Sequence, residues 1–168
     1  WYKGFEVADD VRMLREEFLD LHIGYGDVVL VCLANTAAYP LITQALWEVG
    51  AVMHPVAATT PEKELQQELR EHDYVASIVG QTLVDAALDD RVAIVSALHL
   101  QTYSLLHIIR DRSLMGHDAR IPEEDDLALI MNTSGTTGKP KRVGLTHRIL
   151  LNGVKHDIES HKITSEDT

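Results

Sequence analysis

The densest group of side chains able to do chemistry lies between Thr133 and Lys141, in the order Thr-Ser-Gly-Thr-Thr-Gly-Lys-Pro-Lys. Its first five residues comprise four hydroxyl side chains and one glycine. Hydroxyls, the backbone N–H groups of a glycine-rich turn and a nearby ammonium group can together bind an anion. The same residue types are also ordinary in a polar hairpin loop. Composition leaves both interpretations open, and the order of the residues has to decide between them.

Two common phosphate-binding motifs do not fit this order. The loop of P-loop NTPases has four residues between its glycines and a Ser or Thr directly after its lysine. Here two residues separate Gly135 from Gly138, and Pro140 follows Lys139. The dinucleotide fingerprint also fails, because no third glycine and no helix follow the Gly-Tyr-Gly sequence at 24–26. The stretch therefore matches neither of these phosphate-binding motifs.

The elements on either side must hold this loop in place. The apolar run at 127–132 predicts a strand, residues 133–140 form the loop, and 141–145 predict a second strand. A helix is predicted to start near Thr146, with three apolar residues on one side: Leu150, Val154 and Ile158. The pattern thus places the loop between two strands and just before a helix.

Upstream of the loop, apolar runs alternate with segments of helical periodicity. The predicted strands cover residues 28–34, 51–56, 74–79, 91–95 and 104–110. The predicted helices cover 9–21 and 83–88, and two more begin near residues 36 and 61. This alternation predicts an α/β fold with flanking helices and a mostly parallel sheet, at least as far as the loop.

Helix ends are predicted from local residue types. Asn35 or Thr36 is expected to cap the second helix with its side chain, and Gly50 is expected to end it. Thr60 is expected to cap the third helix, with Pro61 at its first helical position. The one cysteine, Cys32, lies in an apolar run and is expected to be buried as a small hydrophobic residue.

Composition excludes some classes of protein. The formal net charge of −11 argues against a nucleic-acid-binding or anionic-membrane-binding surface for the chain as a whole. No apolar run approaches the roughly 20 residues that a membrane span needs. A charged-then-apolar leader pattern is absent at the start, so a cytoplasmic protein is expected. The chain starts at Trp1 and stops at Thr168, and both ends look cut from something longer.

The order of residues 133–141 resembles the signature loop of adenylate-forming enzymes, which include acyl-CoA synthetases, nonribosomal adenylation domains and firefly luciferase. The resemblance extends through Leu-Ile-Met at 129–131 and Thr-His-Arg at 146–148, and it also covers 35–60 and 62–79. Because it spans nearly the whole chain, we expect residues 1–168 to be the N-terminal part of an AMP-binding domain. On this view the chain ends shortly after the phosphate loop and lacks the C-terminal domain.

Two residues depart from that family's usual pattern. Arg142 stands where glycine is usual, and Ile149 stands where asparagine is common. Arg142 adds a bulky cation beside the loop, which can be tolerated if it points to solvent. Ile149 is expected to alter packing alone. Neither change removes a hydroxyl, a glycine or a lysine from the loop.

The resemblance implies a carboxylate ligase. A carboxylic acid attacks the α-phosphate of ATP to give an acyl-adenylate and pyrophosphate, and coenzyme A or a carrier thiol then takes the acyl group. The implied nucleotide-binding residues are Thr133, Ser134, Gly135, Thr136, Thr137, Gly138, Lys139, Lys141 and His147. Lys141 is the implied catalytic cation. Mg²⁺ would bridge phosphate oxygens, with no metal-ligand set in the protein itself.

Other conspicuous residues have plainer interpretations. A histidine at a helix start is often a cap or a partly buried filler, which is the alternative for His147. His54 is expected to be a strand end, and Trp47 and Tyr39 are expected to pack in a core. The two acids at 125–126 are expected to cover the edge of the loop or to solvate a turn.

The sequence leaves one rival function open. The chain could be a non-catalytic remnant that binds a nucleotide or a partner without ligase chemistry. We expect the isolated chain to be inactive under either reading, because the resemblance places the other substrate-binding motifs and a late catalytic lysine beyond Thr168. An acidic ribose-binding motif and that lysine, encoded downstream, would favour the ligase.

Overall fold

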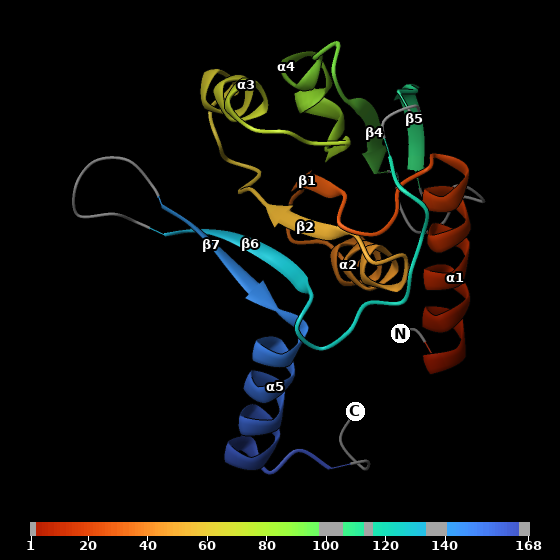
Figure 1. The fold of residues 1–168 in the computed structure, drawn as a ribbon, viewed down its shortest axis with the longest axis vertical. Helices are drawn as coiled ribbons and strands as arrows, with labels where there is room; N and C mark the ends of the chain where they lie inside the picture. Colours follow the sequence, from red (N-terminus) through yellow and green to blue (C-terminus); the bar gives the residue numbers. More distant parts are fainter. Residues whose placement is uncertain (1–2, 98–105, 113–115, 134–140, 165–168) are drawn as a thin grey trace.

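The computed structural model describes residues 3–97, 106–112, 116–133 and 141–164. Seven strands form one sheet in the order β5-β4-β3-β1-β2-β6-β7 (Figure 1). In chain order the elements are α1 (Gly4–Asp20), β1 (Val28–Cys32), α2 (Ala38–Glu48), β2 (Val52–Pro55), α3 (Glu62–Glu71), β3 (Ala76–Val79), the 3₁₀ turn η1 (Gln81–Leu83), α4 (Val84–Ala87), β4 (Ala93–Ala97), β5 (Leu106–Arg110), β6 (Leu127–Thr133), β7 (Lys141–Thr146) and α5 (His147–His161).

The centre of the sheet is parallel and covered on both faces. Strand β1 pairs in parallel with β2 on one side and with β3 on the other. Helices α1 and α2 pack on one face, and α3 and α4 pack on the other. A strand covered on both sides is apolar throughout, and Val29 to Cys32 are all fully buried. The predicted α/β fold and the burial of Cys32 are confirmed.

The predicted mostly parallel sheet is confirmed, with β5 as the one antiparallel strand that the structure describes before the loop. This strand runs antiparallel to β4, with Ala97 opposite Leu106. Only residues 98–105 connect the two strands. A parallel return needs a crossover of about a dozen residues or more, so this connection is too short for one. The length of the connection therefore sets the direction of the edge strand.

The predictions that side chains cap α2 and α3 are wrong. Helix α2 has Ala37 at its cap position, and the backbone carbonyl of Thr36 accepts the N–H of Tyr39 at 3.1 Å. Helix α3 has Pro61 at its cap, one residue later than predicted. The Pro61 carbonyl accepts two N–H groups of the first turn, so no side chain is needed there. Gly50 does end α2, with a φ of 82°.

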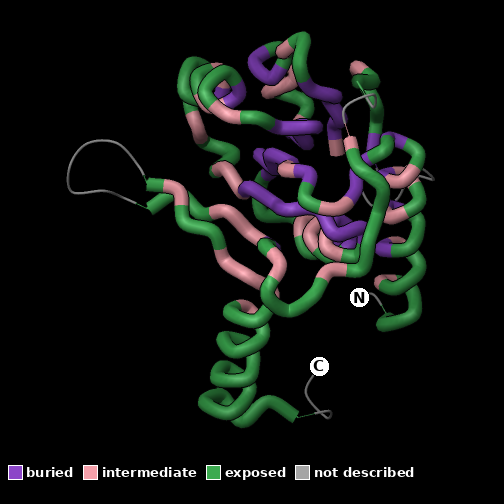
Figure 2. The backbone as a smooth tube through the Cα atoms, in the orientation of Figure 1, coloured by how far each residue is buried: buried purple, intermediate pink, exposed green. Residues whose placement is uncertain are grey.

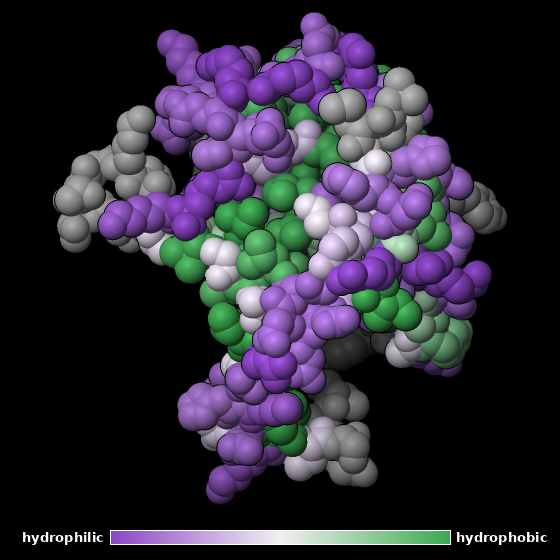
Figure 3. All heavy atoms as spheres, viewed as in Figure 1, coloured by the Kyte–Doolittle hydropathy of each residue, from purple (hydrophilic) through white to green (hydrophobic). Residues whose placement is uncertain are grey.

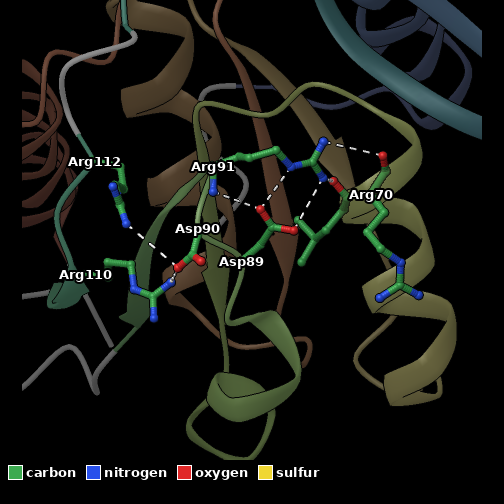
Figure 4. Close-up of polar contacts among 7 residues, drawn as sticks. Arg70, Asp89, Asp90, Arg91, Arg110 and Arg112 are labelled. Carbon is green, nitrogen blue, oxygen red and sulfur yellow. Dashed lines mark hydrogen bonds and ion pairs between the residues drawn. The ribbon is translucent and has the colours of Figure 1, made fainter.

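The C-terminal end of α3 is tied to the start of β4 by Arg91 (Figure 4). Its guanidinium donates to the backbone carbonyls of Leu69 and Arg70, and its Nε donates to Asp89 at 3.0 Å. A cation at this end of a helix satisfies carbonyls that have no partner within the helix. This contact fixes α3 against the body of the sheet.

The hairpin β6–β7 and helix α5 extend away from this core (Figures 1 and 2). Helix α5 has no buried residue, and Val154 and Ile158 of its predicted apolar side are 53% and 43% exposed. Figure 3 shows hydrophobic side chains gathered on the face of the molecule around the hairpin. Within the described ranges, no helix is long and apolar enough to cross a membrane.

The segment that leads into β6 is fastened to the sheet by Asp27. The buried carboxylate accepts the backbone N–H groups of Gly24 and His117, each at 2.8 Å, and contacts His117 Nδ1 at 2.5 Å. That hydrogen bond raises the pKa of His117. A Cβ on Gly24 would lie 2.1 Å from the His117 carbonyl oxygen, so the two backbones touch directly. Asp27 therefore anchors the segment from which the hairpin starts.

Asp27→Ala should destabilise the chain by about 3 kcal/mol, because it leaves buried N–H groups without their charged acceptor. Urea unfolding followed by circular dichroism measures this change. Asp118→Ala, at a neighbouring exposed acid, is the matched control and should change stability by less than about 0.5 kcal/mol. Equal effects of the two substitutions would contradict the anchoring role of Asp27.

Candidate functional site

The predicted phosphate loop joins the outer ends of β6 and β7. These strands pair antiparallel, with Thr133 opposite Lys141 and Asn132 opposite Arg142. Thr133 is the last residue of β6, and its hydroxyl donates to the backbone carbonyl of Lys141 at 3.2 Å. The structure therefore brings two of the predicted binding residues together. The other loop residues lie outside the described residues: Ser134, Gly135, Thr136, Thr137, Gly138 and Lys139.

His147 lies at the opposite end of β7 from Lys141. It begins α5 immediately after β7 ends. Six strand residues span roughly 20 Å, so the structure does not bring His147 to the loop end of the hairpin. Its ring packs edge-on against Trp47, with ring centroids 5.6 Å apart, and burial lowers its pKa. The indole Nε1 of Trp47 donates to the Ala128 carbonyl at 2.9 Å.

Charged residues brace this inner end of the hairpin. Asp126 accepts a hydrogen bond from the hydroxyl of Tyr25 at 2.6 Å and another from Arg120 at 3.1 Å. The bond from Tyr25 is the main cause of the lowered pKa of Asp126. Arg148 in α5 contacts Asp125 at 2.7 Å and lowers its pKa. The sequence predicted that these two acids cover the edge of the loop or solvate a turn. In the structure they lie in a turn, far from the loop.

A groove of about 700 Å³ lies between α3, the end of β2 and the outer part of the hairpin. Helix α3 and the residue that follows it contribute Glu64, Glu68 and His72 to its wall, and the hairpin contributes Asn132 and Arg142. Side chains of a strand alternate between its two faces. Because Arg142 lines this groove, the side chain of Lys141, the preceding residue, is directed to the other face of the hairpin.

Glu68 is the centre of a polar network beside this groove. The hydroxyl of Tyr74 donates to Glu68 at 2.5 Å and also contacts Nδ1 of His54 at 2.5 Å. His72 Nε2 lies 3.6 Å from the same carboxylate oxygen, and the Arg142 guanidinium lies 3.8 Å from it. Arg142 also lies over the Tyr74 ring, 5.6 Å from its centroid.

Two sequence expectations change in this network. Arg142 is only 25% exposed and turns toward α3, whereas the sequence suggested that it could point to solvent. His54 is fully buried inside the network and is not a simple strand end. Arg142 stood out in the sequence because it replaces the glycine that is usual at this position in adenylate-forming enzymes. His54 gave no signal, because its partner Tyr74 is 20 residues away in the chain.

The network also fixes the protonation of His54. Burial is the main cause that lowers the pKa of His54 to about 4, and it outweighs the nearby charge of Glu68. Tyr74 uses its one proton toward Glu68, so we assign the imidazole proton to Nδ1, which then donates to the Tyr74 oxygen. Nε2 is left unprotonated and has no hydrogen-bond partner in the described part of the chain.

Metal ligands are not clustered in the described residues. No group of three or more His, Cys, Asp or Glu side chains there could hold a metal ion. The polar side chains of the outer hairpin itself are hydroxyl, amide, guanidinium and ammonium groups, which bind anions. The described part of the hairpin thus fits a ligand that carries its own negative charge.

Comparison with known proteins identifies the family of this chain. The sequence profile of the AMP-binding enzyme family matches residues 3–168. The chain belongs to this family. The predicted resemblance to adenylate-forming enzymes is therefore confirmed over nearly the whole chain.

Two sequence relatives and one solved structure illustrate what this AMP-binding enzyme chain is similar to. It is 24% identical over 160 residues to 4-coumarate–CoA ligase-like 9 of Oryza sativa subsp. japonica, covering 91% of this chain and 29% of that protein. It is 26% identical over 165 residues to a nonribosomal peptide synthetase of Aspergillus rugulosus, covering 89% and 2%. ATP-bound MatB from Rhodopseudomonas palustris shares the fold, with a TM-score of 0.71, 16% identity, and coverage of 96% and 33%. The chain thus spans less than a third of the length of the rice relative.

His54→Gln should remove a pH-dependent part of the stability. The folded state holds His54 neutral down to a pKa of about 4, whereas the unfolded chain takes up the proton near pH 6.5. Stability should therefore fall by about 2 kcal/mol from this group as the pH falls from 7 to 5. Urea unfolding at both pH values should show a smaller loss in His54→Gln than in the wild type. His156→Gln, on exposed α5, is the control, and parallel profiles in all three proteins would refute the assignment.

Proposed function

We propose that this chain forms the ATP-phosphate-binding part of an AMP-forming carboxylate ligase. The observation that carries the proposal is the hairpin, which places Thr133 and Lys141 side by side at the two ends of a loop rich in hydroxyls and glycine. The hairpin adjoins β2 at the edge of the parallel strands, and β6 runs parallel to β2. The loop therefore leaves the carboxyl end of β6, which is the side of such sheets where ligands bind.

The reaction needs positioning and charge stabilisation more than covalent chemistry from the protein. The carboxylate oxygen of the acid forms a bond to the α-phosphorus of ATP, and the bond from that phosphorus to the bridging oxygen of pyrophosphate breaks. Negative charge develops on the departing pyrophosphate. In our proposal the Lys141 ammonium group neutralises this charge, and the loop hydroxyls and N–H groups donate hydrogen bonds to it.

Mg²⁺ fits this scheme as part of the nucleotide. The described residues offer no cluster of metal ligands, so we assign the ion to the phosphate oxygens of ATP and derive no step through a protein-held metal. Bound there, Mg²⁺ would neutralise part of the phosphate charge. The residues of this chain would still have to orient the phosphates and contact the leaving group.

A thiol is the proposed acceptor of the acyl group. The rice relative is named a CoA ligase, and the Aspergillus relative is a peptide synthetase. Coenzyme A and a carrier-bound thiol are both consistent with these names. We propose a small carboxylic acid, ATP and one of these thiols as the substrates of the whole enzyme, of which these 168 residues supply the phosphate contacts.

The 168 residues alone should not catalyse the first half-reaction, because they span less than a third of the rice relative. The measurement is carboxylate-dependent exchange of labelled pyrophosphate into ATP, tested over a panel of aliphatic and aromatic acids. Exchange should stay at the level of a protein-free control. Acid-dependent exchange that Lys141→Ala abolishes would show that the isolated chain is a complete adenylating unit, contrary to our proposal.

Lys141→Ala should weaken binding of inorganic pyrophosphate by about tenfold to a hundredfold, because it removes a charge-assisted contact. Isothermal titration calorimetry of the 168-residue chain measures the affinity. Lys155→Ala, at an exposed lysine of α5, is the control and should leave the affinity unchanged. If both variants bind as tightly as the wild type, Lys141 does not contact the leaving group.

A further inference from the structure

The outer half of the hairpin has few contacts with the rest of the sheet. Among the described residues, β7 is the last strand of the sheet and pairs with β6 alone. Strand β6 in turn pairs with β2 at Met53 and Leu129, nearer the inner end of the hairpin. The last residues of β6 and the first residues of β7 therefore extend beyond this pairing. A side-chain contact is needed to hold them against the body of the protein.

Arg142 supplies such a contact. Its guanidinium lies 3.8 Å from the Glu68 carboxylate of α3, and both side chains are mostly buried, at 25% and 19% exposed. Glu68 is itself held by the hydroxyl of Tyr74 at 2.5 Å and lies 3.6 Å from His72. The acceptor that Arg142 contacts is therefore fixed to α3 and to the segment before β3, and it cannot simply follow the hairpin.

We propose that Arg142 is a positioning residue that clasps the hairpin to α3 and thereby fixes where Lys141 lies. Adjacent strand residues point to opposite faces, so an Arg142 held on the α3 face commits Lys141 to the other face. A shift of one residue would exchange the two side chains. The contact between Arg142 and Glu68 thus determines where the Lys141 ammonium group lies and on which face of the hairpin it meets phosphate. This inference rests on the proposed function.

The clasp is a feature of this chain's own sequence. The resemblance implies a glycine at this position in the usual pattern of adenylate-forming enzymes, and a glycine could make no side-chain contact with Glu68. The arginine stem also covers the Tyr74 ring, with the guanidinium 5.6 Å from the ring centroid. Packing of the stem and attraction of the charge therefore act together, and substitutions can separate them.

Four variants separate these contributions. Arg142→Met keeps a long apolar stem and removes the charge, and Arg142→Lys keeps the charge on a different head group. Glu68→Gln removes the acceptor charge but keeps an oxygen for the Tyr74 hydroxyl. Arg112→Met is the matched control, because Arg112 lies at the same 3.8 Å from Asp90 and far along the sheet from the hairpin. Circular dichroism verifies that each variant is folded.

Hydrogen–deuterium exchange tests the clasp without any ligand. Arg142→Met should speed amide exchange in 129–133 and 141–144 by about threefold to tenfold, while β1 amides stay unchanged. Arg142→Lys should restore much of the protection. Glu68→Gln should act like Arg142→Met. A double variant that combines Arg142→Met with Glu68→Gln should exchange no faster than either single variant, as expected for two residues that form one contact. Unchanged exchange in Arg142→Met, or additive effects in the double variant, would overturn the clasp.

Pyrophosphate titration tests the positioning of Lys141. Arg142→Met should weaken pyrophosphate binding by the same threefold to tenfold, Arg142→Lys should recover it, and Arg112→Met should have no effect. Faster exchange with unchanged affinity would overturn the positioning role. A wild-type chain that binds no pyrophosphate would overturn the proposed function together with the phosphate part of this inference, and the exchange result alone would then decide whether Arg142 holds the hairpin.

Discussion

The pairing of β6 with β2 joins the loop-bearing hairpin to the rest of the protein. Met53 lies opposite Leu129 in this pairing, and Leu129 packs against the core on the α2 side. Trp47 strengthens the junction by donating its indole N–H to the carbonyl of Ala128. The parallel sheet is rigid because both of its faces are covered, so the hairpin starts from a fixed base. Every contact that the loop could make with a nucleotide depends on this junction.

The two faces of the hairpin have separate tasks. One face carries Leu129 against the core and, further out, Lys141. The other face carries Arg142 toward Glu68 and a groove with charged walls. A two-stranded extension at the edge of a sheet is weak by itself, and contacts on one face leave the other face available for a ligand. This division explains how an exposed hairpin can hold a cation in a defined place.

Much of the fold could be predicted because it depends on local patterns. Continuous apolar runs marked the buried parallel strands, and Gly50 marked the end of α2 because the chain needs a positive φ there. The direction of β5 was missed because the apolar pattern alone does not reveal it. The caps of α2 and α3 were missed because backbone carbonyls replaced the expected hydroxyls.

The candidate site was only partly accessible to the same reasoning. The residue order at 133–141 predicted phosphate binding, and the structure places Thr133 opposite Lys141 at the ends of the predicted loop. The wide separation of His147 from Lys141 follows from strand geometry, because five extended residues intervene. The polar network around Glu68 joins β2, α3, the segment before β3, and β7. Its members come from distant parts of the chain, so no local sequence pattern could predict it.

The central claim is that the outer end of the hairpin binds the phosphates of a nucleotide. Its most direct measurement is a titration of the ¹⁵N-labelled chain with magnesium and inorganic pyrophosphate, followed by amide chemical shifts. The account predicts that the largest saturable shifts fall on Thr133, Lys141 and their hairpin neighbours. None should fall on the separate cavity of about 380 Å³ that Asp27, Arg91 and His117 line. Shifts centred on that cavity, or no saturable shift in the hairpin, would contradict it.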